Sequence, residues 1–170
     1  MVNARYALLL GLLIAIPSTF GQTKPGFSGT WKMDVARSES AHQDVPTGPS
    51  TLVIRQTADG ISVETTRTEN GKPDAFHETL NFKLDGSETT STGDGGVPVK
   101  GKVRWDGKNL VVETVRNLQD STVTTLYVHS LSADGRELTV DKSLTVQHGY
   151  QFRGAATTGR GKDIFVRVAD

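Results

Sequence analysis

Residues 97–116, VPVKGKVRWDGKNLVVETVR, decide the fold class of this chain. From Val99 to Trp105, apolar residues or glycine alternate with lysine or arginine. That period of two is typical of a β-strand that turns one face to a core and the other to water. The pair Asp106-Gly107 suits the positive φ angles of a tight turn, and a second apolar run follows it. The segment is therefore predicted to form an antiparallel hairpin.

The same signals recur along most of the chain. Asp-Gly pairs stand at 59–60, 85–86 and 134–135, each next to alternating apolar residues. Threonine (21 residues) and valine (17 residues) are abundant, and β-branched side chains favour strands over helices. No helical period is visible, although residues 34–40 suit a short turn. The expected strands cover residues 29–35, 52–54, 61–63, 76–84, 97–105, 110–116, 123–127, 138–146 and 164–168.

This arrangement predicts an all-β fold with mostly hairpin connections. Closing the sheet on itself removes the exposed edges that a long open sheet would have. We expect a single antiparallel up-and-down β-barrel of about eight to ten strands, with a β-sandwich as the alternative. Three segments interrupt the strands: a long loop at 36–50, a Ser/Thr/Gly-rich loop at 86–96 and a flexible hairpin loop at 154–162.

Composition narrows the classes of partner. The 170 residues carry 19 basic and 19 acidic side chains, a neutral balance that argues against nucleic acid. The chain has no cysteine, which excludes disulfides and Cys-ligated metal sites. Its four histidines show no metal-ligand spacing. We therefore expect no metal and no cofactor, and the sequence contains no recognisable catalytic constellation.

The first 21 residues have the pattern of a secretory signal peptide. Arg5 precedes an apolar run at residues 7–16, and Pro17 and the small residues around Gly21 follow it. A run of ten residues is too short to span a membrane, which takes about 20. The prediction is a signal peptide at 1–21 and one domain at 22–170. The mature protein would be periplasmic or secreted, monomeric and without a transmembrane segment.

Gly29-Thr30-Trp31 resembles the Gly-x-Trp signature of the lipocalins. The wider stretch 29–38, together with the turns at 105–110 and 132–140, is similar to small exported bacterial lipocalin-like (calycin-type) β-barrel proteins. The resemblance implies that Trp31 plugs the closed end of a barrel and that a late basic residue packs over its ring. Arg153 and Arg167 are the candidates, and we assign Arg167 with Gly29 and Trp31 to the barrel base.

The same resemblance implies that the barrel binds a small, mostly apolar molecule. It places the 36–50 loop at the barrel mouth and brings no catalytic residues with it. The predicted function is accordingly an exported binding protein for a small apolar or amphiphilic ligand. The alternative is a non-enzymatic envelope or extracellular interaction module whose core is filled.

Four residues are candidates for contact with the polar end of such a ligand. Glu78 and Lys142 share the apolar face of their strands, where an unpaired charge is costly. They either enter the barrel cavity or turn to solvent at a bulge or rim. Tyr127 and His129 share a face of another strand, with Arg116 near across the hairpin. They either line the cavity mouth or belong to the core.

A basic stripe is the candidate surface for the alternative function. Lys100, Lys102 and Arg104 alternate along one strand, and Lys108 extends the stripe beyond the turn. Such a stripe either meets an anionic polymer or lipid, or is a solvated face that discourages edge pairing. Glu113 on the partner strand is expected to neutralise part of it.

Overall fold

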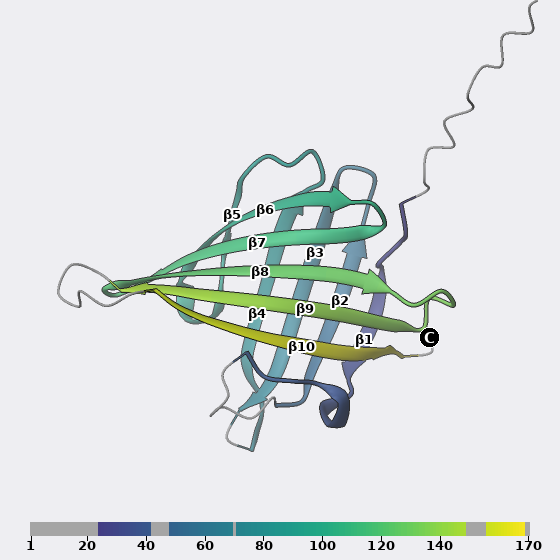
Figure 1. Cartoon of the computed structure of the whole chain (residues 1–170), viewed down its shortest axis with the longest axis horizontal. Coiled ribbons are helices and arrows are strands. Elements are labelled where there is room, and N and C mark those ends of the chain that lie inside the picture. The colour runs from purple at the N-terminus through teal and green to yellow at the C-terminus, as the bar shows by residue number, and fades with distance from the viewer. Residues whose placement is uncertain (1–23, 42–47, 70, 149–155, 169–170) are drawn as a thin grey trace, which may run out of the picture.

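The computed structural model describes residues 24–41, 48–69, 71–148 and 156–168. They form one antiparallel sheet of ten strands (Figure 1). The strands are β1 (Gly29–Met33), β2 (Ser50–Gln56), β3 (Gly60–Glu69), β4 (Lys72–Lys83), β5 (Thr89–Thr92), β6 (Pro98–Asp106), β7 (Asn109–Leu118), β8 (Ser121–Leu131), β9 (Glu137–His148) and β10 (Thr157–Arg167).

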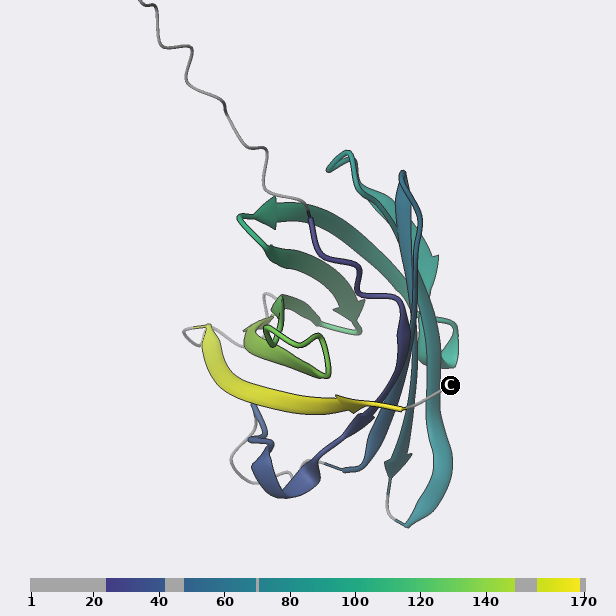
Figure 2. The same ribbon diagram turned by 90° about the vertical axis from the view of Figure 1, so that its right-hand side faces the viewer.

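The strand order is β4-β3-β2-β1-β10-β9-β8-β7-β6-β5. Consecutive strands are therefore neighbours in the sheet, with the exception of β4 and β5, which form its two ends. In addition, the first strand, β1, pairs with the last, β10. The sheet curls so that β1–β4 cross behind β6–β10 (Figures 1 and 2). The predicted up-and-down antiparallel barrel is confirmed, and it is nearly closed.

Buried and exposed side chains alternate along the strands, and the buried ones form the core inside the barrel. In β6, Val99, Gly101 and Val103 are buried while Lys100 and Lys102 are exposed, as the period of two predicts. The predicted hairpin is confirmed, because β6 pairs with β7 from Val99 to Asp106. The largest fully buried side chains are Trp31, Phe27, Phe165, Ile54, Leu110, Leu138, Val99, Val103 and Thr114.

The base of the barrel is built around Trp31. Its indole Nε1 donates a hydrogen bond to the Phe27 carbonyl at 3.0 Å. The Arg167 guanidinium lies over the indole, 4.1 Å from the ring centroid, a favourable cation–π geometry. Arg167 also donates to the carbonyls of Ser28 and Gly135. A side chain at Gly29, whose φ is +143°, would collide with that guanidinium.

Two of the predicted loops are wrong in part. The 86–96 segment contains β5 and a 3-10 turn, η2 (Asp94–Gly96). Residues 157–162, predicted as a hairpin loop, are the first half of β10. Their inward positions are Gly159 and Gly161, so the apolar alternation that marks other strands is missing there.

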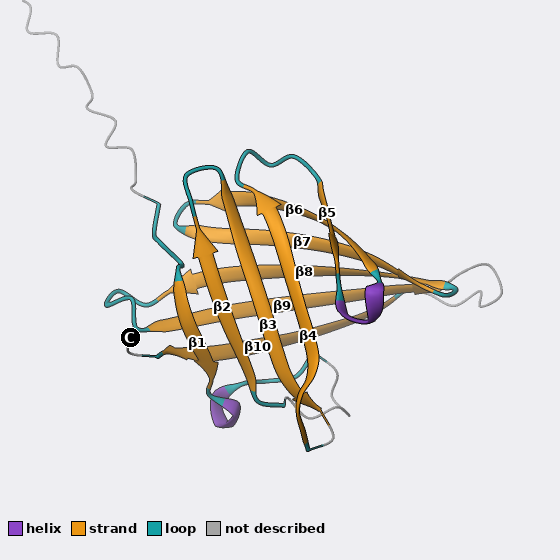
Figure 3. Ribbon diagram, turned by 180° about the vertical axis from the view of Figure 1, so that it is seen from behind, coloured by secondary structure: helices purple, strands orange, loops and turns teal. Residues whose placement is uncertain are grey.

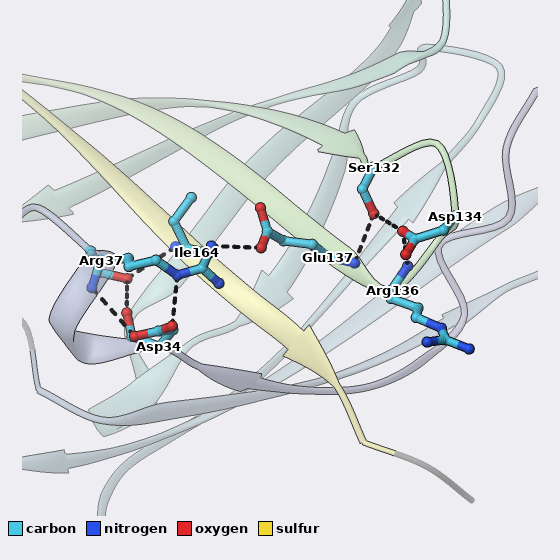
Figure 4. A network of polar contacts seen from close by, with 8 residues as sticks. Asp34, Arg37, Ser132, Asp134, Arg136, Glu137 and Ile164 are labelled. Atoms are coloured by element: carbon cyan, nitrogen blue, oxygen red, sulfur yellow. Dashed lines mark hydrogen bonds and ion pairs between the residues drawn. The ribbon is translucent and has the colours of Figure 1, made fainter.

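The predicted turn at 34–40 is confirmed as a 3-10 turn, η1 (Val35–Arg37). Arg37 joins Asp34 and Glu137 through ion pairs of 2.7 Å each (Figure 4). The chain then returns to β10, where Glu39 and Lys162 exchange two backbone hydrogen bonds. Residues 38–41, which we name the strap, continue across the inner face of β10.

The two glycines of β10 make room for the strap. A side chain at Gly159 would collide with the Ala41 carbonyl, and one at Gly161 would meet the backbone of residues 39–41. On the far side of the barrel, Pro49 accepts a backbone hydrogen bond from Thr68 of β3. The described ends of the 36–50 segment therefore lie at the β10 and β3 walls of the same barrel end. Residues 42–47 lie outside the described part.

The predicted signal peptide and Arg153 also lie outside the described residues. Within residues 24–41, 48–69, 71–148 and 156–168, no helix has the length and apolar character needed to cross a bilayer.

Candidate functional site

Two ion pairs lie on the inner wall of the barrel, away from its base. In the first, Glu78 of β4 accepts two hydrogen bonds from Arg116 of β7, at 2.7 and 2.9 Å. The side chains are 7% and 17% exposed, respectively. Burial acts to lower the pKa of Arg116, but the hydrogen bonds and charge of Glu78 outweigh it, so the pKa is raised. The fork geometry fixes both side chains.

The second pair joins Lys142 of β9 to Asp163 of β10. The Lys142 Nζ donates to the carboxylate at 2.7 Å, and the side chains are 19% and 11% exposed. Burial raises the pKa of Asp163, while the charges of Lys142 and Arg67 oppose that shift. Arg67 stands on β3, on another wall of the barrel, with its guanidinium over the Phe76 ring at 4.3 Å. Charged side chains from β3, β9 and β10 thus face the same barrel interior.

Tyr127 lies between the two pairs. It is the register partner of Lys142 across the β8–β9 ladder. Burial raises the pKa of its phenol, and the positive charge of Arg116 opposes this effect. Nearby on β7, the Thr114 Oγ1 is buried and has no hydrogen bond of good geometry within the described part of the chain. A bound molecule would find hydroxyl, ammonium and guanidinium groups together here.

His129 lies deeper than Tyr127. Its ring packs edge-on against Phe27 of the barrel base, with the centroids 6.3 Å apart. Its Nδ1 is 3.3 Å from the Leu110 carbonyl, so this nitrogen carries the proton in that hydrogen bond. Burial lowers its pKa to about 4, despite the opposing effect of the Leu110 carbonyl. His129 is therefore a neutral core residue and does not line the mouth with Tyr127.

The interior changes character from the base to the open end. At the base, the inward residues are apolar and buried. Farther along the same strands, Thr65, Arg67, Val123 and Leu144 face inward and remain partly accessible to solvent. The ion pairs stand between these two regions, so the wall offers an apolar floor and a polar ring above it.

The sequence singled out one residue of each ion pair, as a candidate contact for a ligand's polar end. Glu78 and Lys142 were identifiable because each interrupts an apolar alternation, and both face the interior. The pairing itself was missed, because Arg116 was named only as a neighbour of Tyr127 and His129, and Asp163 was not named. The signal for Arg116 was its place on the inward face of β7, in line with the apolar residues Leu110 and Val112. Asp163 lies in the strand that has glycines at its inward positions, so no apolar period marked it.

Comparison with known proteins finds similar structures but no match in sequence. No family model and no curated protein matches the sequence. A secretory abundant heat soluble protein from Ramazzottius varieornatus has a similar structure, with a TM-score of 0.55 and 17% identity over 86% of this chain and 98% of that one. The fatty acid transporter REP1-NXSQ gives a TM-score of 0.53 and 14% identity over 85% and 97%.

A point mutant of the fluorescent protein UnaG gives a TM-score of 0.51 and 22% identity over 85% and 97%. These likenesses agree with the up-and-down antiparallel β-barrel described above. At these identities the likeness concerns the fold alone, and the function of this barrel has to be argued from its own side chains.

The outer surface of the barrel carries the basic stripe. Lys100 and Lys102 point outward, and their ion pairs are with Glu88, at 3.4 and 3.6 Å. The expected neutralising residue, Glu113, is the register partner of Lys102 on β7, but the carboxylate in these ion pairs belongs to Glu88. Within the described ranges, no group of three His, Asp or Glu side chains converges as metal ligands would.

Proposed function

We propose that this protein binds one small apolar or amphiphilic molecule inside its barrel. The molecule's apolar body would lie on the buried floor, and its polar end would meet the ring formed by Lys142, Asp163, Tyr127, Glu78 and Arg116. Burial of the apolar body would contribute about 25 cal/mol per Å² of apolar surface, while the polar ring would fix the orientation.

The two inward ion pairs carry this proposal. A buried ion pair costs desolvation, and well-packed apolar side chains of similar volume are often as stable or more so. A barrel that acted through its surface alone would gain nothing from charges on its inner wall. Charges that face an interior which solvent partly reaches are suited to a molecule with a polar end.

A matched pair of variants tests the proposal. Lys142→Met with Asp163→Leu removes one ion pair without leaving a charge unpaired. Lys102→Met removes a lysine of the outer surface. Titration with 1-anilinonaphthalene-8-sulfonate, an amphiphilic fluorescent probe, gives the dissociation constant of each protein. We expect the inner double variant to bind about tenfold or more weakly, since a charge-assisted hydrogen bond is worth about 1.5–3 kcal/mol. Lys102→Met should bind like the parent protein.

Equal affinities for the parent and the inner variant would contradict the role of the polar ring. A parent protein that takes up no probe would contradict binding altogether and would favour the filled-core interaction module. The basic stripe would then be the surface to test, with Glu88→Gln releasing its two lysines.

We also propose that the protein is exported, on the strength of the charged, apolar and small-residue pattern in residues 1–21. N-terminal sequencing of the protein recovered from the envelope or medium should begin at Gln22. A chain that retains Met1 would contradict export by this signal.

A further inference from the structure

The seam between β4 and β5 differs from every other strand boundary of this barrel. These two strands are the ends of the sheet order, and no backbone ladder joins them in the described residues (Figure 3). The backbone of Asn81 points into the seam and bonds to side-chain hydroxyls of β5. Its N–H donates to Ser91 Oγ at 2.9 Å, and its carbonyl accepts from Thr89 Oγ1 at 2.8 Å.

On the inner side, side chains from β4 reach across the seam at two points. The Phe82 ring lies against Gly101 of β6, where any side chain would collide with it. The Glu78–Arg116 pair passes over Gly93. A Cβ at Gly93 would lie 3.0 Å from both the Glu78 carboxylate and the Arg116 guanidinium. Glycine is thus present at both points where a β4 side chain crosses the seam.

On the outer side, the seam is a groove of about 560 Å³. Phe82 lines this groove and is also a buried member of the core. Phe82 thus belongs both to the lining of the groove and to the buried core. The other lining residues are Thr79, Asn81, Lys83, Thr89, Thr90, Ser91 and Thr92.

The strap at the open end is fastened more firmly. Glu39 and Lys162 exchange backbone hydrogen bonds of 2.6 and 2.9 Å there, which hold the strap to β10. Moving the strap breaks backbone pairing. Parting the seam breaks no backbone ladder, but it separates the hydroxyl bonds to Asn81, the contact of Phe82 with Gly101 and the Glu78–Arg116 ion pair. Exposed side-chain bonds are among the first to open in local fluctuations.

We propose that the ligand enters and leaves the barrel sideways through the β4–β5 seam, which opens when Phe82 moves away from Gly101. This inference rests on the proposed function, because it concerns the route to the same interior. The hydroxyls of Thr89 and Ser91 hold the two edges together between passages, and they also keep the unpaired edge of β4 from pairing with other chains.

A disulfide across the seam provides the direct test. The natural chain has no cysteine, so the pair Asn81→Cys with Ser91→Cys introduces the two thiols alone. Loss of two hydrogens in the intact mass shows that the bond has formed. Stopped-flow mixing with 1-anilinonaphthalene-8-sulfonate then gives association and dissociation rates for the oxidised protein and for the same sample after reduction.

We expect oxidation to slow both rates by the same factor of about ten or more while the dissociation constant stays unchanged. Reduction should restore both rates. Equal rates in the oxidised and reduced samples would overturn the route and leave the proposed function standing. A parent protein that takes up no probe would overturn the proposed function, and the route with it.

A second pair of variants decides the matter if the disulfide does not form. Phe82→Leu shortens the side chain that covers Gly101, and Leu80→Val shortens the preceding inward residue of β4 away from that contact. Exchange of the probe should be faster in Phe82→Leu and unchanged in Leu80→Val. Equal exchange rates in Phe82→Leu and the parent would overturn the proposal.

Discussion

Removing one partner of the Glu78–Arg116 pair should destabilise the barrel strongly. Glu78→Gln keeps the size of the side chain but removes its charge, and it turns one acceptor of the bidentate pair into an amide donor. Arg116, whose side chain is 17% exposed, would keep its charge without a counter-ion. Breaking a buried pair in this way costs about 3–5 kcal/mol. Because some solvent reaches Arg116, we expect about 2–4 kcal/mol here.

The assay is thermal unfolding followed by the fluorescence of Trp31 and Trp105. For a domain of about 150 residues, each kcal/mol corresponds to about 2–4 °C in the unfolding midpoint. A loss of 3 kcal/mol would therefore lower the midpoint by about 6–12 °C. The double variant Glu78→Leu with Arg116→Met should recover most of the stability, since no charge is left unpaired. A loss below about 1 kcal/mol in Glu78→Gln would refute the reasoning, because that is the cost of breaking an exposed pair.

Three further predictions concern the base of the barrel, acid stability and the strap. The pKa of His129 is lowered to about 4 by burial, so only the unfolded chain takes up its proton between about pH 6.5 and 4. Stability is thus present above pH 6.5 and falls by about 3 kcal/mol towards pH 4; His129→Phe should remove this slope in urea unfolding at several pH values. Gly29→Ala should cost about 2 kcal/mol or more, through its positive φ and its collision with Arg167; Gly26→Ala, in open space, should unfold like the parent. Gly159→Val should detach the strap and speed hydrogen exchange at the backbone amides of Glu39 and Lys162, whereas unchanged exchange there would show that the strap does not depend on this glycine.

The fold was predictable because its signal repeats. Apolar alternation and Asp-Gly turns mark most of the strands, and barrel closure follows from the number of strands and their hairpin connections. β5 escaped prediction because it is four residues of Thr and Ser, with no apolar member. The first half of β10 escaped because a strap covers its inward face, so glycines stand where apolar side chains would otherwise be.

The part of the candidate site that could be predicted is the part that apolar alternation along the strands identifies. A charge in an apolar row, such as Glu78 or Lys142, stands out in any sequence. Alternation fixes which face a residue occupies but not its depth along the barrel, and that is why the sequence left open whether Tyr127 and His129 line the mouth or belong to the core. Partners such as Arg116 lie on strands far along the chain, so their contact depends on strand register and barrel curvature.

The central claim is that the barrel interior holds a small molecule. Native mass spectrometry of the mature protein, isolated from its own source without denaturation, tests it most directly. We expect an added, extractable mass from a small apolar or amphiphilic compound, and a smaller share of the Lys142→Met/Asp163→Leu variant should carry it. A bare polypeptide that also takes up no apolar probe would contradict it.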